Sequence, residues 1–195
     1  MKISISRDLN LNNLKFVAER LAGIEYSIFF GTLLGFQREA NIIEHDDDID
    51  IYVNSLHREE ILDIFSGSEL VIKPELPRNS SPCFLQGVRI FEQTRTFVDF
   101  YFYEENKEHD YIIERWNFSG RWNNPNNTMH VPKDYFYPIQ AANMQGIDLK
   151  VPAAPNELCA FLYGDRWEEP MSKGSQYRMG MRNNRPKMIL IDDDS

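Results

Sequence analysis

The sequence predicts an α+β domain in which a mixed β-sheet is flanked by helices. Hydrophobic residues make up 42% of the chain and aromatic residues 13%, which is enough to build a substantial core. Helix-like and strand-like apolar patterns alternate along the chain, without an internal repeat or a clear linker. With 195 residues, the chain is most simply one domain over 1–195, with a core of about 11–170 and a polar tail over 171–195.

The N-terminal part is expected to fold as a helix, a strand and a second helix. Apolar residues with helical spacing predict the first helix over 11–21, and Gly23 ends it. The apolar run over 24–30 is rich in aromatic and β-branched residues, which predicts a buried strand. A break at Gly31-Thr32 separates this strand from a helical turn over 33–40.

The middle of the chain is expected to supply most of the sheet. Ser55 is a suitable N-cap for a helix over 57–65, because Glu59 and Glu60 lie in its early turns. A proline-rich loop is expected over 74–82. Runs of β-branched and aromatic residues predict strands over 48–53, 69–73, 83–91, 95–103 and 110–115.

The C-terminal part is expected to contain an irregular stretch, a strand and a short helix. Residues 117–127 are rich in asparagine, glycine and tryptophan and predict irregular structure. A strand over 147–151 is expected to pair with an edge of the sheet. Asn156 is expected to cap a short helix that Gly164 closes in a left-handed conformation.

The charge of the chain argues against several classes of partner. The net charge is −9, so the overall field repels nucleic acid and anionic membrane surfaces. The first residues lack the apolar core of a signal peptide, and no stretch of about 18 apolar residues predicts a transmembrane helix. We therefore expect a cytoplasmic protein that binds no nucleic acid. The basic segment over 173–187 is expected to be a solvated tail, or else a clamp on an anionic ligand.

Four aspartates lie within five positions where the strand over 48–53 begins. Alternate residues of a strand point to the same face, so Asp48 and Asp50 stand side by side, about 6.6 Å apart at their Cα atoms. Asp46 has the same parity but lies in the preceding loop, and Asp47 is expected to face away. Carboxylates about 5 Å apart repel by about 3 kcal/mol at an effective dielectric of about 20. Such a cluster is either a solvated acidic turn or a site for a divalent cation.

The spacing excludes a calcium loop of the helix–loop–helix type. Counted from Asp46, the sixth position is Ile51, where that loop needs glycine. The twelfth position is His57, where the loop needs glutamate. A different kind of cation site is therefore required if the aspartates bind metal.

A lone aspartate in a later apolar strand adds to this pattern. Asp99 stands between Val98 and Phe100, and its burial is costly unless it is paired or bound to metal. The turn at Gly31-Thr32 is expected to leave backbone N–H groups and a hydroxyl free to receive a phosphate. Three carboxylates with such a turn favour phosphoryl transfer assisted by Mg²⁺, with Mn²⁺ as a possible substitute.

Two blocks of sequence resemble a known family. The first block joins residues 31–38 (GTLLGFQR) to residues 43–51 (IEHDDDIDI). The second begins at 150–152 (KVP), continues through Pro155 and residues 157–158 (EL), and ends with residues 163–170 (YGDRWEEP). Both blocks are similar to the signature of the LicD and fukutin-related family. With the strand around Asp99 included, the resemblance covers about residues 24–170. It implies a fold similar to that of the polymerase-β-like nucleotidyltransferases.

The resemblance also implies an activity and a set of site residues. Members of the family move a phosphorylated alcohol, such as phosphocholine or ribitol phosphate, from a CDP-linked donor to a sugar hydroxyl. Asp99 would be a metal ligand or the base that receives the acceptor's proton. Gly31 and Thr32 would hold the donor phosphate, and Arg38 would neutralise developing charge. The catalytic and metal-binding carboxylates would be Asp48, Asp50 and Asp99.

Two other functions stay open. A nucleotidyltransferase would keep the same fold but pass a nucleoside monophosphate from a triphosphate to a small molecule or protein. A non-catalytic module would bind nucleotide or metal without turnover, and the complete set of three aspartates argues against it. The expected partners are therefore a nucleotide-activated donor, with a CDP-alcohol favoured, and a glycan or polyol-phosphate acceptor.

Overall fold

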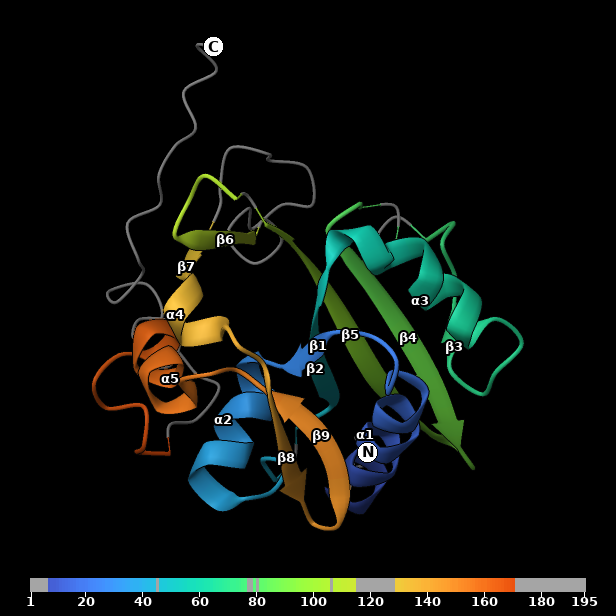
Figure 1. Ribbon diagram of the computed structural model, residues 1–195. Helices are drawn as coiled ribbons and strands as arrows, with labels where there is room; N and C mark the ends of the chain where they lie inside the picture. The colour runs from blue at the N-terminus through green and yellow to red at the C-terminus, as the bar shows by residue number, and fades with distance from the viewer. Residues whose placement is uncertain are drawn as a thin grey trace.

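A mixed sheet of seven strands forms the centre of the structure, which is a computed structural model (Figure 1). β6 (Tyr111–Glu114) pairs with the end of β5, and β7 (Met129–Pro132) pairs with β6. The spatial order of the others is β1 (Tyr26–Ile28), β2 (Asp48–Asn54), β5 (Thr94–Glu105), β4 (Phe84–Phe91) and β3 (Val71–Ile72). The structure describes residues 7–44, 46–76, 79, 81–105, 107–114 and 129–170.

The pairing of β2 with β5 is parallel, and the other pairs in this sheet are antiparallel. Parallel neighbours need a long crossover connection. Here the chain passes through α3 (Arg58–Phe65) and the β3–β4 pair before it returns as β5. The predicted mixed sheet with flanking helices is confirmed.

One face of the sheet is covered by α1 (Arg7–Arg20) and α3 (Figure 1). The Phe65 ring of α3 lies 5.5 Å from the Phe100 ring, between centroids. The Arg89 guanidinium lies 3.9 Å from the centre of the Phe16 ring of α1. The central residues of β2 and β5 that point to this face are fully buried, and they include Ile49, Ile51, Val98 and Phe100. This face is the main core of the protein.

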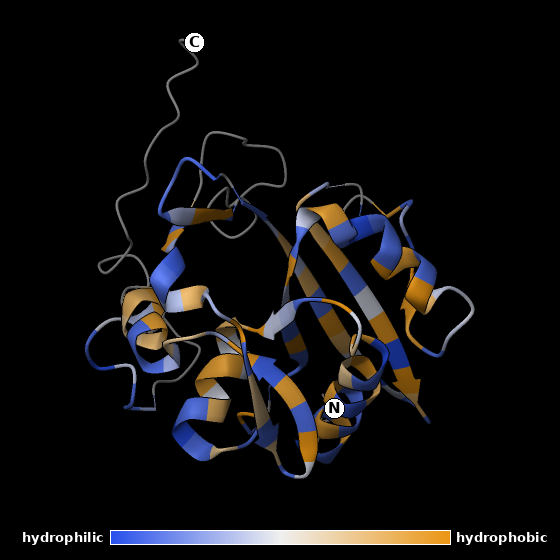
Figure 2. Cartoon of the chain, viewed as in Figure 1, coloured by the Kyte–Doolittle hydropathy of each residue, from blue (hydrophilic) through white to orange (hydrophobic). Residues whose placement is uncertain are grey.

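Aromatic side chains cover part of the opposite face. Phe29 stacks on Tyr52 with 4.0 Å between ring centroids. Phe136, from α4 (Lys133–Phe136), meets Tyr52 edge-on at 5.6 Å. α2 (Phe30–Glu39) and α5 (Pro155–Tyr163) pack against each other beside this cluster (Figure 1). Figure 2 shows hydrophobic residues concentrated on the strands and on the helix sides that face them.

A separate two-stranded sheet joins β8 (Gln140–Met144) to β9 (Ile147–Val151). The turn between them uses left-handed residues, with φ of 53° at Gln145 and 80° at Gly146. The strand predicted over 147–151 is confirmed, but it pairs with β8 and not with an edge of the main sheet. The polar sequence of β8 gave no strand signal, so its partner could not be predicted.

The starts of four helices differ from the predictions. α1 begins at Arg7, before the predicted start at residue 11. α2 begins at Phe30 and includes Gly31 and Thr32, where a break between strand and helix was expected. The boundary was hidden because the apolar run continues from the strand into the helix without an intervening polar residue. Asn54 accepts a hydrogen bond from the Leu56 N–H and caps the turn before α3, so Ser55 is not the cap. In α5, proline occupies the first helical position after Ala154, and Asn156 lies inside the helix.

Two predicted segments lie outside the described residues: the irregular stretch over 117–127 and the polar tail over 171–195.

Gly164 ends α5 with a positive φ of 88°, although its ψ of 176° is extended and not left-handed helical. Among the helices that the structure describes, none is both long and apolar enough to cross a membrane.

Candidate active site

The structure brings together the three carboxylates that the sequence singled out. Asp48 and Asp50 lie on β2, and Asp99 lies on β5, where it stands directly opposite Asp50 in the parallel register. One oxygen from each of the three residues lies within 4.8 Å of the others. We call the side of the sheet that carries these residues the acidic face.

Three cross-strand rows define the surroundings of these carboxylates on the acidic face. Residues paired across strands point to the same side of a sheet. The middle row is Gln86, Asp99 and Asp50. The row on one side is Val88, Phe97 and Asp48, and all three are half-buried. The row on the other side is Phe84, Tyr101 and Tyr52, and all three are buried. The middle row of carboxylates therefore lies between a half-buried row and a buried aromatic row.

Asp50 is held by the start of α2. Its carboxylate accepts the Gly31 N–H at 2.8 Å, and its own N–H donates to Thr32 Oγ1 at 2.8 Å. Its carbonyl accepts the Phe29 N–H at 3.1 Å. Phe30, between these residues, has a φ of 37°, a left-handed value that is strained for a bulky residue. The start of α2 therefore binds Asp50 at three points: its carboxylate, its N–H and its carbonyl.

The turn at Gly31-Thr32 was expected to leave its N–H groups and hydroxyl free for a phosphate. Instead, the Gly31 N–H and the Thr32 hydroxyl oxygen both bond to Asp50. Gly31 is also closely packed between carboxylates. A Cβ atom at this position would lie 2.9 Å from an oxygen of Asp46 and 3.1 Å from one of Asp50. The role of these two residues toward a donor phosphate stays a prediction.

Arg38 lies apart from the three carboxylates, in the last turn of α2. Seven residues of helix separate it from Gly31, which corresponds to about 10 Å along the axis. Its charge acts on Cys159 of α5, where burial raises the thiol pKa to about 12 and Arg38 opposes that rise. The structure does not bring Arg38 to the carboxylates.

The electrostatics of the site favour a bound cation. Burial is the main cause that raises the pKa of Asp50 well above its usual value, and Asp48, Asp99 and Asp46 raise it further. The pKa of Tyr101 is also raised, by burial and then by Asp50 and Asp99. Carboxylate oxygens within 4.8 Å of one another repel by at least about 3 kcal/mol per pair at an effective dielectric of about 20. Oxygen donors of this kind suit Mg²⁺, so the residues present fit the predicted ion.

The two remaining aspartates of the cluster differ in burial. Asp47 is exposed, as expected, whereas Asp46 is only 5% exposed although it precedes the strand. The Asp46 carbonyl accepts a hydrogen bond from Asn10 Nδ2 at 2.7 Å, which ties this loop to α1. Asp46, Asp47 and Asp48 form a second carboxylate group with oxygens within 4.8 Å. The sequence sign that Asp46 could belong to the site was its spacing, since it lies at alternate positions with Asp48 and Asp50.

Two other residues at the site were missed by sequence reasoning. Gln86 donates from Nε2 to Asp99 Oδ1 at 2.7 Å, and Tyr101 lies two residues after Asp99 on the same face. The one signal for Gln86 was a polar residue among apolar ones in a strand. That pattern does not show which strand lies next to it.

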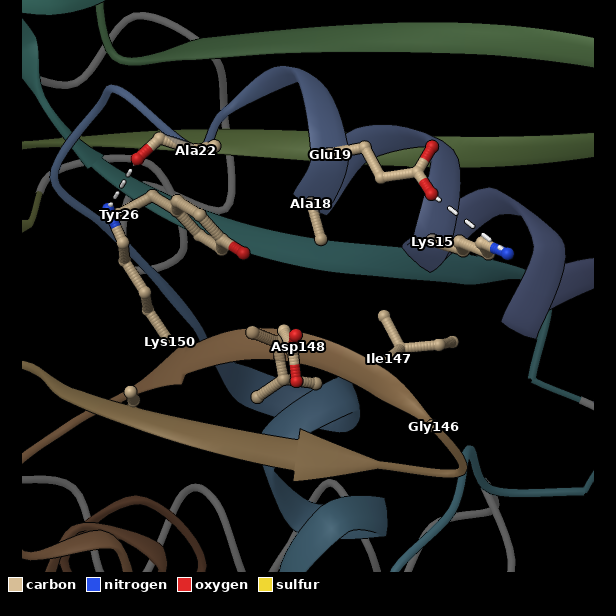
Figure 3. Close-up of a pocket in the computed structure, with 11 residues that line it drawn as sticks. Lys15, Ala18, Glu19, Ala22, Tyr26, Gly146, Ile147, Asp148 and Lys150 are labelled. Carbon is tan, nitrogen blue, oxygen red and sulfur yellow. Dashed lines mark hydrogen bonds and ion pairs between the residues drawn. The ribbon is translucent and has the colours of Figure 1, made fainter.

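A cavity of about 350 Å³ lies elsewhere, between α1 and the β8–β9 hairpin (Figure 3). Its lining contains none of the predicted site residues. Its charged groups have partners, since Lys15 pairs with Glu19 at 4.0 Å and Lys150 Nζ donates to the Ile24 carbonyl at 2.5 Å. The acidic face, with its concentration of buried like charges, is therefore the candidate active site.

The fold and the acidic site together define the class of the nucleotidyltransferase-like transferases. A family model described as LicD/FKTN/FKRP, nucleotidyltransferase domain, matches residues 23–154. Since the match covers more than half of the chain, the protein belongs to this family. The resemblance that the sequence motifs indicated is confirmed. No curated protein matches the sequence.

Two solved structures align with most of this chain. The lincosamide antibiotic adenylyltransferase LnuA, solved with lincomycin bound, aligns with a TM-score of 0.52 and 11% identity, covering 92% of this chain and 96% of that one. The antibiotic-resistance factor ANT(2'')-Ia aligns with a TM-score of 0.45 and 12% identity, covering 91% of this chain and 82% of that one. The likeness to LnuA shows the fold and leaves the substrate open.

Proposed function

We propose that the protein is a Mg²⁺-dependent phosphotransferase that moves a phosphorylated alcohol from a CDP-linked donor to a hydroxyl of a glycan. The observation that carries this proposal is the gathering of three carboxylates within 4.8 Å, in a chain of the LicD/FKTN/FKRP family. Phosphoryl transfer depends more on positioned charge than on covalent chemistry. Two strands that hold carboxylates in register supply that positioning.

The three aspartates would share the work at the reacting phosphate. Asp48, Asp50 and Asp99 would hold Mg²⁺, or Mn²⁺ in its place, and Asp99 could instead accept the proton of the acceptor hydroxyl. The bound cation would neutralise charge on the transferred phosphoryl group. Gly31 would keep the Asp50 carboxylate turned toward this group through its N–H, and Thr32 would hold the backbone of Asp50 by accepting its N–H.

The donor is expected to lie along the start of α2. Gly31 and Thr32 lie in its first turn, where the helix dipole favours anions, and they are our candidates for contacts to the donor phosphate. The Thr32 hydroxyl can donate its proton while its oxygen accepts the Asp50 N–H, whereas the Gly31 N–H would have to exchange the Asp50 carboxylate for the phosphate. Arg38 would reach a more distant part of the donor, since it lies about 10 Å further along the helix. We further propose a single cytoplasmic domain with a glycan or polyol-phosphate acceptor and no nucleic acid partner.

A nucleotidyltransferase reaction is the second candidate, and the fold shared with LnuA, an adenylyltransferase, favours it. The two reactions break different bonds of the donor. The first would release cytidine monophosphate from a CDP-alcohol, and the second would release pyrophosphate from a nucleoside triphosphate. A module without turnover is disfavoured, because all three carboxylates are present.

A binding screen followed by product analysis tests these proposals. Thermal unfolding of the full chain would be measured with CDP-alcohols and with nucleoside triphosphates, each with and without Mg²⁺. A ligand at a hundred times its Kd adds about 2.7 kcal/mol to the free energy of unfolding. Mg²⁺-dependent stabilisation by a CDP-alcohol, with release of cytidine monophosphate, is the expected result. Stabilisation by triphosphates alone, with release of pyrophosphate, would favour the second candidate.

A further inference from the structure

Gln86 touches the third carboxylate of the site. It stands opposite Asp99 in the antiparallel pair of β4 and β5, and its Nε2 donates to Asp99 Oδ1 at 2.7 Å. An ionised carboxylate only accepts hydrogen bonds, so the amide nitrogen has to be the end of the side chain that faces Asp99. Gln86 therefore holds one oxygen of Asp99 in a defined position.

The chemistry of β4 makes this amide stand out. The other β4 residues that point to the acidic face, Phe84, Val88 and Ile90, are apolar. Asp99 is only 5% exposed, and a buried carboxylate needs donors to offset the loss of water. Gln86 brings such a donor into an otherwise apolar series.

The backbone of Gln86 is fixed by a second side chain, Asn79. Asn79 Oδ1 accepts the Gln86 N–H at 2.7 Å, and Asn79 Nδ2 donates to the carbonyl of Gln86 at 3.0 Å. The same Nδ2 also donates to the Lys73 carbonyl at 3.0 Å. β3 ends at Ile72, opposite Gly87, so the Asn79 side chain takes the place of the next strand residue. Asn79 is only 1% exposed, and this part of β4 is therefore held firmly.

We propose that Gln86 is a positioning residue that sets the orientation of the Asp99 carboxylate for the divalent cation. This inference rests on the proposed function, because it requires the three carboxylates to bind metal. Loss of the Gln86 donor removes one restraint on rotation of the carboxylate about its side-chain bonds, and its oxygens are then held less closely to those of Asp48 and Asp50. Loss of an outer partner of a metal ligand typically weakens metal affinity or activity by about 10- to 100-fold.

Two variants of the full-length chain test this role. Gln86→Met keeps the length of the side chain without the donor, and Gln86→Asn keeps the amide but is one methylene too short to reach. Gln140→Met is the matched control, since Gln140 is exposed on β8 and donates to the Ala153 carbonyl at 3.4 Å. Mn²⁺ affinity would be measured by titration calorimetry, and thermal unfolding would be followed in EDTA to check folding.

Both Gln86 variants are expected to bind Mn²⁺ about tenfold more weakly than the wild type, while Gln140→Met binds as the wild type does. In steady-state assays, kcat should fall and the KM for the donor should stay nearly constant. Unchanged Mn²⁺ affinity in the folded Gln86 variants would overturn the positioning role and leave the proposed function standing. A wild-type protein that binds no Mn²⁺ would overturn the metal site itself, and both proposals with it.

Discussion

Asp50 and Asp99 lie directly opposite each other in neighbouring parallel strands, and both are 5% exposed. Two buried carboxylates in register cost free energy in the absence of a cation. The fold nevertheless holds them together, with Gly31 bonded to one and Gln86 to the other. This arrangement lowers the free energy of unfolding of the metal-free protein and holds the carboxylates in a fixed geometry before any cation binds.

Replacing Asp50 with asparagine should separate activity from stability. Asp50→Asn is expected to reduce turnover by about a thousandfold, because metal stabilisation of a transition state is worth several kcal/mol and 1.36 kcal/mol is tenfold. The free energy of unfolding in EDTA should rise by about 1 kcal/mol as the repulsion is relieved. Asp48→Ala should likewise abolish turnover and leave the fold intact. Asp63→Asn, on the exposed side of α3, is the control, and retained turnover in Asp50→Asn would refute the assignment.

The raised pKa of Asp50 makes the metal-free protein less stable as the pH increases. Below the ordinary pKa of 3.8, Asp50 is protonated in the folded and unfolded states alike. As the pH rises toward the higher pKa of the folded state, the unfolded chain ionises first, and the stability contributed by the protonated group is lost. The stability advantage of Asp50→Asn in EDTA should therefore grow as the pH rises above the ordinary pKa of 3.8. Unfolding curves with a constant difference as the pH rises would contradict the burial of this charge.

A methyl group at Gly31 should disturb the site without straining the backbone. The Cβ of Gly31→Ala would lie 2.9 Å from an Asp46 oxygen and 3.1 Å from an Asp50 oxygen, so both carboxylates must move. We expect Mn²⁺ affinity to fall about tenfold, by analogy with other changes around metal ligands. Gly23→Ala is the matched control, because a Cβ there has no atom within 4 Å. Equal affinities in the two variants would show that the carboxylates have room to adjust.

Two buried tyrosines should respond in opposite directions to loss of the hydroxyl. The Tyr52 hydroxyl has no hydrogen-bond partner among the described residues, so Tyr52→Phe should raise the free energy of unfolding by about 1 kcal/mol. The Tyr103 hydroxyl lies 2.7 Å from that of Tyr137, so Tyr103→Phe should lower it by about 1 kcal/mol. Each change corresponds to about 2–4 °C in Tm for a chain of this size. Destabilisation by both variants would point to an unrecognised partner of Tyr52.

The parts of the site that depend on local pattern could be predicted from the sequence. The alternation of Asp48 and Asp50 follows from the period of a strand, and the apolar neighbours of Asp99 mark it as an unusual buried charge. The gathering of these three residues is what the structure shows. Their roles in binding and catalysis stay predictions.

The parts that depend on strand order could not be predicted. The contact between Gln86 and Asp99 requires β4 to lie next to β5, and nothing local to either strand shows this. The start of α2 was also hidden, since Phe29 and Phe30 continue the apolar run of β1 while the chain already turns into the helix. The turn that was expected to offer free groups at Gly31 and Thr32 instead binds Asp50, and that pairing arises only in the folded chain.

The pairing of Asp50 with the first turn of α2 also links two protein amides that are distant along the chain. The Gly31 N–H donates to the Asp50 carboxylate, and the Asp50 N–H donates to the Thr32 hydroxyl oxygen. Neither amide can reach solvent unless the helix start and the strand separate. The Gly31 and Asp50 amides should therefore exchange with deuterium through one shared opening event. The frequency of that event would measure how often the start of α2 separates from β2 at the three carboxylates.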